Sequence, residues 1–268
     1  MKKVVFLLAM MPLIVASCGG SNESNENKEI VIDTTINETI IITNEDAKSV
    51  TFASADGLEI TGNLYEIDKE SPIIVLCHQA GYNKFEYEGT AQRLNELGFN
   101  CLAIDQRSGG PIGIYQNETA NRAIEKNIAI DYLSARPDIA AAVEYAYNEF
   151  DQQVILWGSS YSSTLALWEG LRNDKVKAVV AFSPGDYFPE IGSLTDSLAN
   201  FQKPFFITCS DQEIDVTAKM LSKTNLTDEH VFYKPIGIGY HGSRALWPGQ
   251  YNGEQYWTAI KSYLEHLK

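Results

Sequence analysis

Residues 154–165 read V-I-L-W-G-S-S-Y-S-S-T-L, and they are the most informative part of the chain. An apolar run ends at Gly158, and beyond Ser160 leucines recur at helical spacing as far as position 171. A short unbroken apolar run is typical of a strand buried on both faces, and the later spacing is typical of a helix. The stretch therefore predicts a buried strand, a tight turn and a helix, with Ser160 at the tip of the turn.

The spacing Gly158-x-Ser160-x-Ser162 differs at one position from the nucleophile elbow G-x-S-x-G. In that elbow a strained backbone holds the serine so that its hydroxyl stands clear at the top of a sheet. Small residues on either side let the strand and helix backbones come close. Ser162 is small but is not glycine, so an ordinary serine-rich turn is the alternative interpretation.

Strand and helix signals alternate on both sides of this unit, from residue 50 to the end of the chain. Residues 50–53 and 58–65 flank an Ala-Asp-Gly turn signal and predict an antiparallel hairpin. The other expected strands are residues 73–77, 99–104, 176–182, 205–209 and 230–234, and the other expected helices are residues 85–97, 138–150, 216–221 and 255–266. This alternation predicts an α/β fold with a mostly parallel sheet.

Residues 1–17 have the parts of a secretory signal peptide. Lys2 and Lys3 precede an apolar stretch that is short for a membrane span, and small residues follow it. V-A-S-C at residues 15–18 resembles a bacterial lipobox, which implies cleavage before Cys18 and a lipid on its thiol. That resemblance implies a bacterial envelope protein, periplasmic or surface-exposed, that is lipid-anchored to the membrane. A plain secretory signal with an incidental cysteine is the alternative.

Residues 18–49 begin with the lipidated cysteine and continue as G-G-S-N-E-S-N-E-N-K-E, which predicts a flexible tether. The folded domain is then expected at residues 50–268. The formal net charge of the chain is −14. So acidic a surface argues against a nucleic-acid partner and against electrostatic docking to anionic lipid. Membrane attachment is therefore expected to come from the lipid alone.

The remaining cysteines, Cys77, Cys101 and Cys209, each lie in or at the edge of an expected strand. An odd number spread over three strands indicates buried small hydrophobic residues rather than a disulfide. No C-x-x-C and no clustered histidine spacing indicates a metal site, and no cofactor is expected.

A serine hydroxyl needs a base to remove its proton and an acid to orient that base. His241 lies in G-I-G-Y-H-G-S-R, a glycine-rich loop after the last expected strand, where a mobile base would be placed. The serine at 160 and this histidine, at strand ends in that order, resemble those of an α/β-hydrolase. The resemblance covers nearly everything from residue 50 onward and is strongest to dienelactone-hydrolase-like and small carboxylesterase members.

That family has an eight-stranded, mostly parallel sheet flanked by helices, and the resemblance implies the same here. Residues 184–203, which join the sixth and seventh strands, are too few for a large cap domain. Residues 112–115 and 186–188 could supply aromatic walls to the site or pack locally.

The same resemblance suggests the acid. In many α/β-hydrolases the seventh strand reads P-x5-G-x-x-D, and its aspartate completes the triad. Here the register is Pro204-x5-Ser210-x-x-Glu213, which implies Glu213, with Asp211 as the alternative. Asp215 is expected in the first turn of a helix, where a carboxylate meets the helix dipole favourably.

Acyl transfer also needs two backbone N–H donors for the oxyanion. One is expected from Tyr161, directly after the serine. Residues 78–81 read H-Q-A-G and resemble the family's H-G-x-G turn, with Gln79 in place of the first glycine. By position Ala80 supplies the second amide, and His78 is interpreted as a structural histidine that holds the loop.

Residues 105–110, D-Q-R-S-G-G, resemble the family's D-x-R-G-x-G segment, and Asp105 and Arg107 are interpreted as a scaffold ion pair. Together these motifs predict a serine hydrolase that cleaves small-molecule esters, and less readily amides, through an acyl-enzyme. The departures at Gln79, Ser162 and Glu213 motivate the alternative, a non-catalytic envelope lipoprotein that uses the fold as a binding module.

Overall fold

The computed structural model describes residues 47–268. The predicted signal peptide, Cys18 and nearly all of the predicted tether lie outside the described residues. Within residues 47–268, no helix is both long and apolar enough to cross a membrane.

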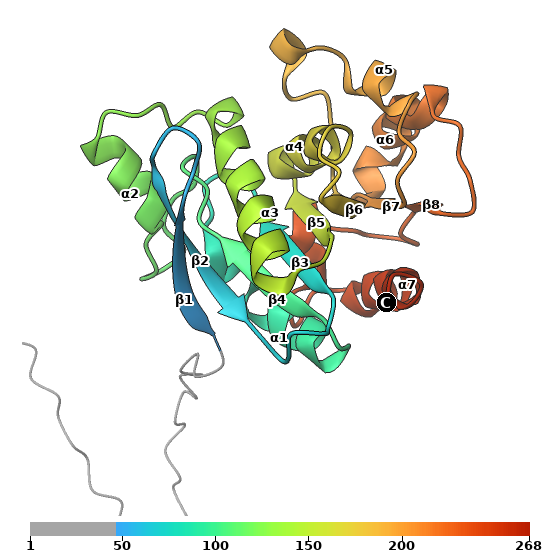
Figure 1. The fold of residues 1–268 in the computed structure, drawn as a ribbon. Coiled ribbons are helices and arrows are strands. Elements are labelled where there is room, and N and C mark those ends of the chain that lie inside the picture. The colour runs from blue at the N-terminus through green and yellow to red at the C-terminus, as the bar shows by residue number, and fades with distance from the viewer. Residues whose placement is uncertain (1–46) are drawn as a thin grey trace, which may run out of the picture. The chain divides into compact units, whose positions relative to one another are not determined.

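One eight-stranded sheet runs through the domain in the order β1-β2-β4-β3-β5-β6-β7-β8 (Figure 1). The β1–β2 and β2–β4 pairs are antiparallel and all the other pairs are parallel. The strands are β1 (Lys48–Ala53), β2 (Glu59–Tyr65), β3 (Ile73–Cys77), β4 (Asn100–Ile104), β5 (Val154–Ser159), β6 (Val176–Phe182), β7 (Phe205–Thr208) and β8 (His230–Tyr233). The predicted hairpin and the mostly parallel sheet are confirmed.

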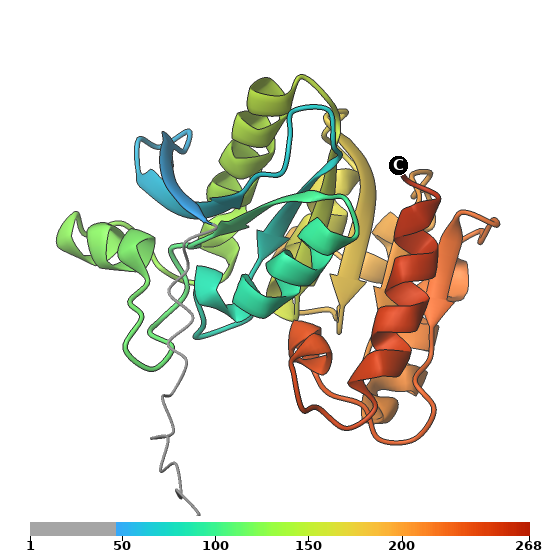
Figure 2. The same cartoon turned by 90° about the horizontal axis from the view of Figure 1, so that it is seen from below.

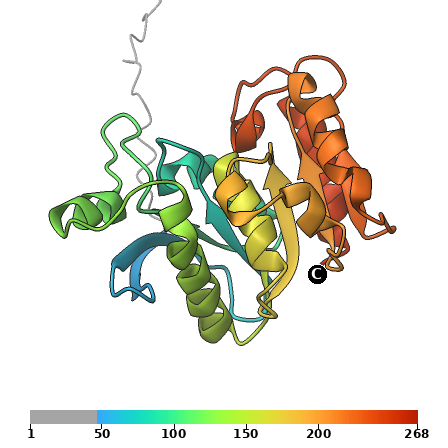
Figure 3. The ribbon, with the colours of Figure 1, turned by 90° about the horizontal axis from the view of Figure 1, so that it is seen from above.

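Helices cover both faces of this sheet (Figures 2 and 3). They are α1 (Glu88–Glu96), α2 (Glu118–Glu125), α3 (Arg136–Phe150), α4 (Tyr161–Gly170), α5 (Leu194–Leu198), α6 (Ile214–Met220) and α7 (Gly253–Glu265), with short 3-10 turns η1 (Lys84–Tyr87), η2 (Leu133–Ala135), η3 (Pro189–Ile191), η4 (Asp211–Glu213), η5 (Leu221–Lys223) and η6 (Gly242–Leu246). Between β6 and β7 the chain forms only η3 and α5, so no large cap is inserted there.

Alternate residues of β3 explain why both faces need a cover. Ile73 and Val75 belong to an apolar cluster that includes side chains of α3, α4, α5 and α6. Ile74 and Leu76 belong to a second cluster, built with α1 and α7. A strand that is buried on both faces has a continuous apolar sequence, as β3 does. The cysteines at 77, 101 and 209 are buried and free, as expected.

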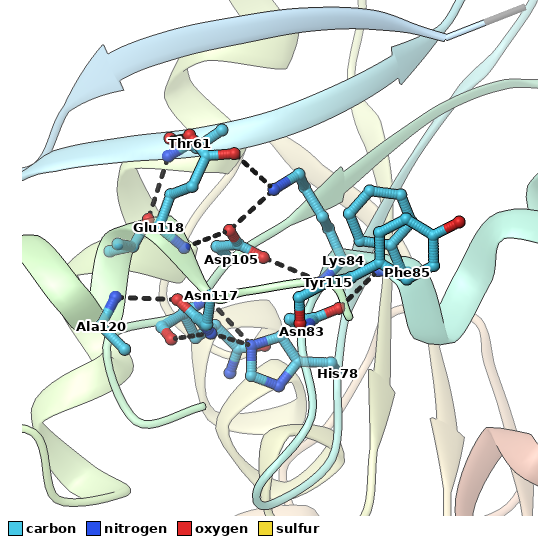
Figure 4. A network of polar contacts seen from close by, with 12 residues as sticks. Thr61, His78, Asn83, Lys84, Phe85, Asp105, Tyr115, Asn117, Glu118 and Ala120 are labelled. Atoms are coloured by element: carbon cyan, nitrogen blue, oxygen red, sulfur yellow. Dashed lines mark hydrogen bonds and ion pairs between the residues drawn. The ribbon is translucent and has the colours of Figure 1, made fainter. Parts of the chain in front are cut away.

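The interpretation of Asp105 and Arg107 as one ion pair is wrong, because each has other partners. Asp105 accepts hydrogen bonds from Lys84 Nζ at 2.9 Å and from the backbone N–H groups at the starts of η1 and α2 (Figure 4). Arg107 instead pairs with Asp138 of α3, 2.7 Å from Nη2 to Oδ1, and with Asp56 of the hairpin turn. Both residues brace the scaffold, in separate networks.

Candidate active site

The predicted site residues meet at one edge of the sheet because parallel strands place their carboxyl ends together. Ser160 follows β5, Glu213 follows β7 and His241 follows β8. The loop at residues 78–81 follows β3, between β4 and β5 in the sheet. Segments far apart in sequence therefore converge on Ser160.

The turn at Ser160 has the strained backbone of a nucleophile elbow. Its φ and ψ are 57° and −126°, a conformation uncommon outside glycine. The Ser160 N–H is fixed by a 2.8 Å hydrogen bond to Phe182 O. At Gly158 a Cβ atom would lie 2.4 Å from Ser163 Cα, so only glycine fits where the strand and helix backbones meet. This strain directs the Ser160 side chain out of the turn.

The serine that replaces the second elbow glycine has partners in the structure. Ser162 Oγ accepts a hydrogen bond from the Ser159 N–H at 3.0 Å and lies 2.7 Å from Cys77 O, to which it donates. The departure from the motif is thus accommodated, and the hydroxyl ties the elbow to the end of β3.

Ser160, His241 and Glu213 form one continuous chain of hydrogen bonds. His241 Nε2 lies 2.7 Å from Ser160 Oγ, and His241 Nδ1 lies 2.5 Å from Glu213 Oε1. The Ser160 residue is 7% exposed, whereas the His241 side chain is 41% exposed. The serine is therefore held in a recess, and solvent reaches the site from the histidine side.

Glu213 is held as an acceptor on its second oxygen as well. Its Oε2 accepts from Ser183 Oγ at 2.8 Å, from the Ser210 N–H at 2.9 Å and from Ser210 Oγ at 2.8 Å. Burial raises the pKa of this carboxyl, but the hydrogen bonds from His241, Ser210 and Ser183 outweigh burial and hold the pKa at about 2. Glu213 is therefore ionised at neutral pH and fixes the His241 ring with a proton on Nδ1.

The two other carboxylates of this loop lie elsewhere. Asp211 Oδ1 accepts a hydrogen bond from the Gly239 N–H at 2.8 Å and so anchors the loop that carries the histidine. Asp215 lies in the first turn of α6. Of the three candidates, the structure brings only Glu213 to the His241 ring.

Ser183 and Ser210 are site residues that sequence reasoning missed. Ser210 and Glu213 form a capping box at the start of η4, and S-x-x-E is the recognised sequence signal for it. That signal could have identified Ser210 as the partner of Glu213. Ser183 connects the acid to the histidine loop, since its Oγ also accepts from the Gly242 N–H at 2.9 Å. Its φ is 55°, and no local sequence signal identifies it.

The two expected oxyanion donors are the backbone N–H groups of Tyr161 and Ala80. Tyr161 is the first residue of α4, so its N–H is among those that no helical carbonyl accepts. In the loop after β3, the buried ring of His78 accepts a hydrogen bond from the Gln106 N–H on Nε2, so its Nδ1 donates to Gln79 O at 2.9 Å. Because carbonyl and N–H point opposite ways in a trans peptide, this bond sets the direction of the Ala80 N–H.

The surroundings of His78 are a buried polar network (Figure 4). Asn117 lies beside the ring and donates to Gln106 O at 2.9 Å, and its side chain also caps α2. Burial lowers the pKa of His78 and keeps it neutral. His78 is thus placed to hold the loop and does not contact Ser160.

Of the expected aromatic walls, Tyr187 borders the site. It is 41% exposed, its hydroxyl donates to Ser183 O at 3.0 Å, and its side chain interacts with that of Ser160. Phe188 is buried edge-on against the Tyr161 ring, and Tyr115 stacks on a neighbouring phenylalanine. Local packing accounts for these two.

The sheet order, the helices on both faces and the strained serine at the carboxyl edge define the α/β-hydrolase fold. Solved structures agree. A carboxyl esterase from Bacillus coagulans is 12% identical with a TM-score of 0.64, over 82% of this chain and 98% of that one. An esterase from Pyrococcus furiosus is 15% identical with a TM-score of 0.62, over 82% and 90% of the two chains. A dienelactone hydrolase from Anabaena variabilis is 16% identical with a TM-score of 0.60, over 82% and 98%.

No family model matches the chain. Among curated proteins, the acyltransferase drtE of Aspergillus calidoustus is 24% identical over 62% of this chain and 56% of its own length. The thiohydrolase apmlB of Arthrinium phaeospermum is 28% identical over 52% of this chain and 43% of its own. The chain thus spans about half the length of the curated relatives it matches. These comparisons establish the fold.

Proposed function

We propose that the protein is a serine hydrolase that cleaves esters of small molecules through an acyl-enzyme. The observation that carries this proposal is the unbroken hydrogen-bonded chain from Ser160 through His241 to Glu213, at the tip of a strained elbow. The solved structures that share the fold include two esterases and a dienelactone hydrolase, which supports the same chemistry.

The first half of the reaction follows from the geometry. Ser160 Oγ attacks the carbonyl carbon of the ester while its proton passes to His241 Nε2, 2.7 Å away. The carbonyl oxygen becomes an oxyanion that the Tyr161 and Ala80 N–H groups stabilise. The ionised Glu213 stabilises the imidazolium. When the tetrahedral intermediate collapses, the C–O bond to the alcohol breaks and His241 returns the proton to the leaving oxygen.

The second half repeats these steps with water. His241 removes a proton from a water molecule, the hydroxide adds to the acyl carbon, and collapse releases the acid and regenerates Ser160 Oγ–H. Since only η3 and α5 lie between β6 and β7 and the His241 side chain is 41% exposed, small or extended esters should reach the serine from solvent.

The names of the two curated relatives, an acyltransferase and a thiohydrolase, both denote acyl transfer. Thioesters are therefore a second substrate class to compare with oxygen esters on the same triad.

A panel of p-nitrophenyl esters from acetate to octanoate, with acetyl-thiocholine as the thioester, tests the proposal. We expect an initial burst of p-nitrophenol equal to the enzyme concentration, followed by steady turnover, and neither in Ser160→Ala. Ser163→Ala, which removes a neighbouring buried hydroxyl, should still turn over. Absence of turnover from the wild-type protein across the panel would favour the binding-module alternative.

We further propose that the mature protein is held in a bacterial envelope by a lipid on Cys18. The signal-like residues 1–17 and the V-A-S-C segment support this. Growth of the expression host with labelled palmitate should label the wild-type chain and not Cys18→Ala. Equal labelling of both chains would exclude this attachment point.

A further inference from the structure

Glu86, on η1, is a buried carboxylate at the site that the triad does not use. The residue is 2% exposed. Its Oε2 accepts a hydrogen bond from the Gln79 N–H at 2.7 Å, and its Oε1 accepts from Ser159 Oγ at 2.8 Å. The Gln79 side-chain amide also reaches Oε1, at 3.4 Å. Every one of these partners is a donor, so the ionised form of Glu86 is the form that satisfies them all.

The partners of Glu86 lie next to the groups that perform the proposed reaction. Gln79 directly precedes Ala80, and Ser159 directly precedes Ser160. Ser159 Oγ also accepts a hydrogen bond from the Ser243 N–H at 2.9 Å, which extends the network to the histidine loop. One carboxylate therefore links the loop at residues 78–81, which we call the oxyanion loop, to the elbow at Ser160 and to the loop that carries His241.

The two peptides that flank the Gln79 Cα atom are each held by one hydrogen bond. Glu86 accepts from the Gln79 N–H, which belongs to the preceding peptide, and the His78 ring donates to the Gln79 carbonyl, which shares its peptide with the Ala80 N–H. The direction of the Ala80 N–H is set by that peptide plane. The H-G-x-G turn of α/β-hydrolases has glycine at position 79. Here the side-chain amide of Gln79 reaches Glu86 Oε1, so Gln79 helps to hold the loop and Glu86 together.

Two further hydrogen bonds hold η1, the turn that carries Glu86, in place. The backbone carbonyl of Glu86 accepts from Trp247 Nε1 at 2.8 Å, and the next residue, Tyr87, donates from its hydroxyl to Cys77 O at 2.8 Å. Burying a carboxylate without a directly bonded cation is costly, and a purely structural position could use an apolar side chain at lower cost.

We propose that Glu86 is a positioning residue whose carboxylate holds the oxyanion loop and the nucleophile elbow in the geometry that acyl transfer requires. This inference rests on the proposed function. The loss expected from its removal is smaller than that of deleting an oxyanion donor, which costs about 100-fold to 1,000-fold in kcat, because the Ala80 N–H is loosened and not removed. We expect a decrease on the order of 10-fold in Glu86→Gln and 100-fold in Glu86→Ala.

The acid side of the pH profile distinguishes positioning from packing. Burial raises the pKa of Glu86 to about 7, against the hydrogen bonds from Gln79 and Ser159 and the positive charge of Arg244. Tyr87 is the other titratable group that lies near Glu86. Lys84, on the same 3-10 turn, forms its ion pairs with Asp105 and Glu118. Protonation of Glu86 turns one of its acceptor oxygens into an O–H donor, which then faces a second donor.

Protonation of Glu86 therefore lowers the activity of the wild-type enzyme as pH falls through about 7. Between pH 8 and pH 6, the logarithm of kcat/KM for p-nitrophenyl acetate should fall with a steeper slope in wild type than in Glu86→Gln. The roughly 10-fold advantage of wild type at pH 8 should disappear at the acid end, because a protonated carboxyl and an amide make similar contacts. At pH 8, KM should stay within about twofold of wild type while kcat falls.

The test compares wild type, Glu86→Gln and the matched control Glu88→Gln, which changes a partly exposed carboxyl two residues away. The second-order rate of Ser160 labelling by a fluorophosphonate is measured beside the steady-state constants. Slower labelling, lower kcat and a shallower acid limb in Glu86→Gln alone support the inference. Wild-type rates and an unchanged slope in that variant overturn it.

If Glu86→Gln does not fold, as judged by circular dichroism and thermal melting, the same rates are measured for Ser159→Ala. That variant cuts the bridge between Glu86 and Ser243 and leaves the Glu86–Gln79 bond. A loss of about 10-fold supports the inference, and wild-type rates overturn it. A wild-type protein that the fluorophosphonate does not label overturns the proposed function itself, and this inference with it.

Discussion

Replacing Glu213 by glutamine should disable the triad by reversing the His241 tautomer. Glu213 Oε2 accepts from three donors, two on Ser210 and one on Ser183. In the variant, the amide oxygen must occupy this position, because an NH2 group there would face three donors. The amide NH2 is then forced toward His241 Nδ1. Nδ1 must accept, so the ring proton moves to Nε2, which can no longer receive the proton of Ser160.

The expected magnitude follows from this forced tautomer. An equivalent acid-to-amide change in a serine triad lowers kcat by about 10⁴-fold. The structure gives no reason for a smaller effect, since both oxygens of Glu213 are committed. The assay is steady-state hydrolysis of p-nitrophenyl acetate at pH 8, with melting temperature recorded to show that the variant is folded.

Asp211→Asn is the matched control on the same turn. Its Oδ1 accepts from Gly239 N–H at 2.8 Å, and an amide oxygen can accept the same bond, so kcat should change by no more than a few-fold. If Asp211→Asn abolished turnover while Glu213→Gln did not, the assignment of the acid would be refuted.

Three further predictions concern stability, each measured by urea unfolding. Gly158→Ala forces a Cβ into the backbone of α4 and should lower the free energy of unfolding by on the order of 3 kcal/mol. A variant with wild-type stability and a wild-type m-value would contradict this prediction. Asp138→Ala breaks the buried ion pair with Arg107 and should lower the free energy of unfolding by about 3 kcal/mol, the low end of the range for such a pair, because Asp56 still pairs with Arg107. Asp196→Ala breaks an exposed pair and should cost less than about 1 kcal/mol. The folded-state pKa of Glu213 is about 2 against an ordinary 4.5, so its stabilisation is present above pH 4.5 and is lost as pH falls toward 2. The difference in unfolding free energy between wild type and Glu213→Gln should shrink over that range, and a constant difference would contradict it.

Much of the fold could be predicted because apolar runs and turn signals act locally. The strand predicted at residues 176–182 coincides with β6, and the elbow before α4 was recognised from spacing alone. Fully buried parallel strands leave continuous apolar runs, which few other structures produce. The position of β3 between β4 and β5 could not be predicted from local signals, because it depends on how segments distant in sequence pair.

Charge pairing and buried polar contacts could not be predicted in the same way. Nothing near Arg107 in sequence indicates that Asp138 lies against it, because the contact depends on how α3 packs on the sheet. Glu86 was read only as part of a helix over residues 85–97. Its burial arises where η1 meets the elbow and the histidine loop, three segments that are distant in sequence.

Covalent labelling tests directly whether Ser160 is the nucleophile. The protein is incubated with a fluorophosphonate at pH 8, and the modified peptide is identified by mass spectrometry. We predict one phosphonyl group per chain, on Ser160 and not on Ser159, Ser162 or Ser163, and no modification in Ser160→Ala. An unmodified wild-type protein, or a label that persists in Ser160→Ala, would contradict it.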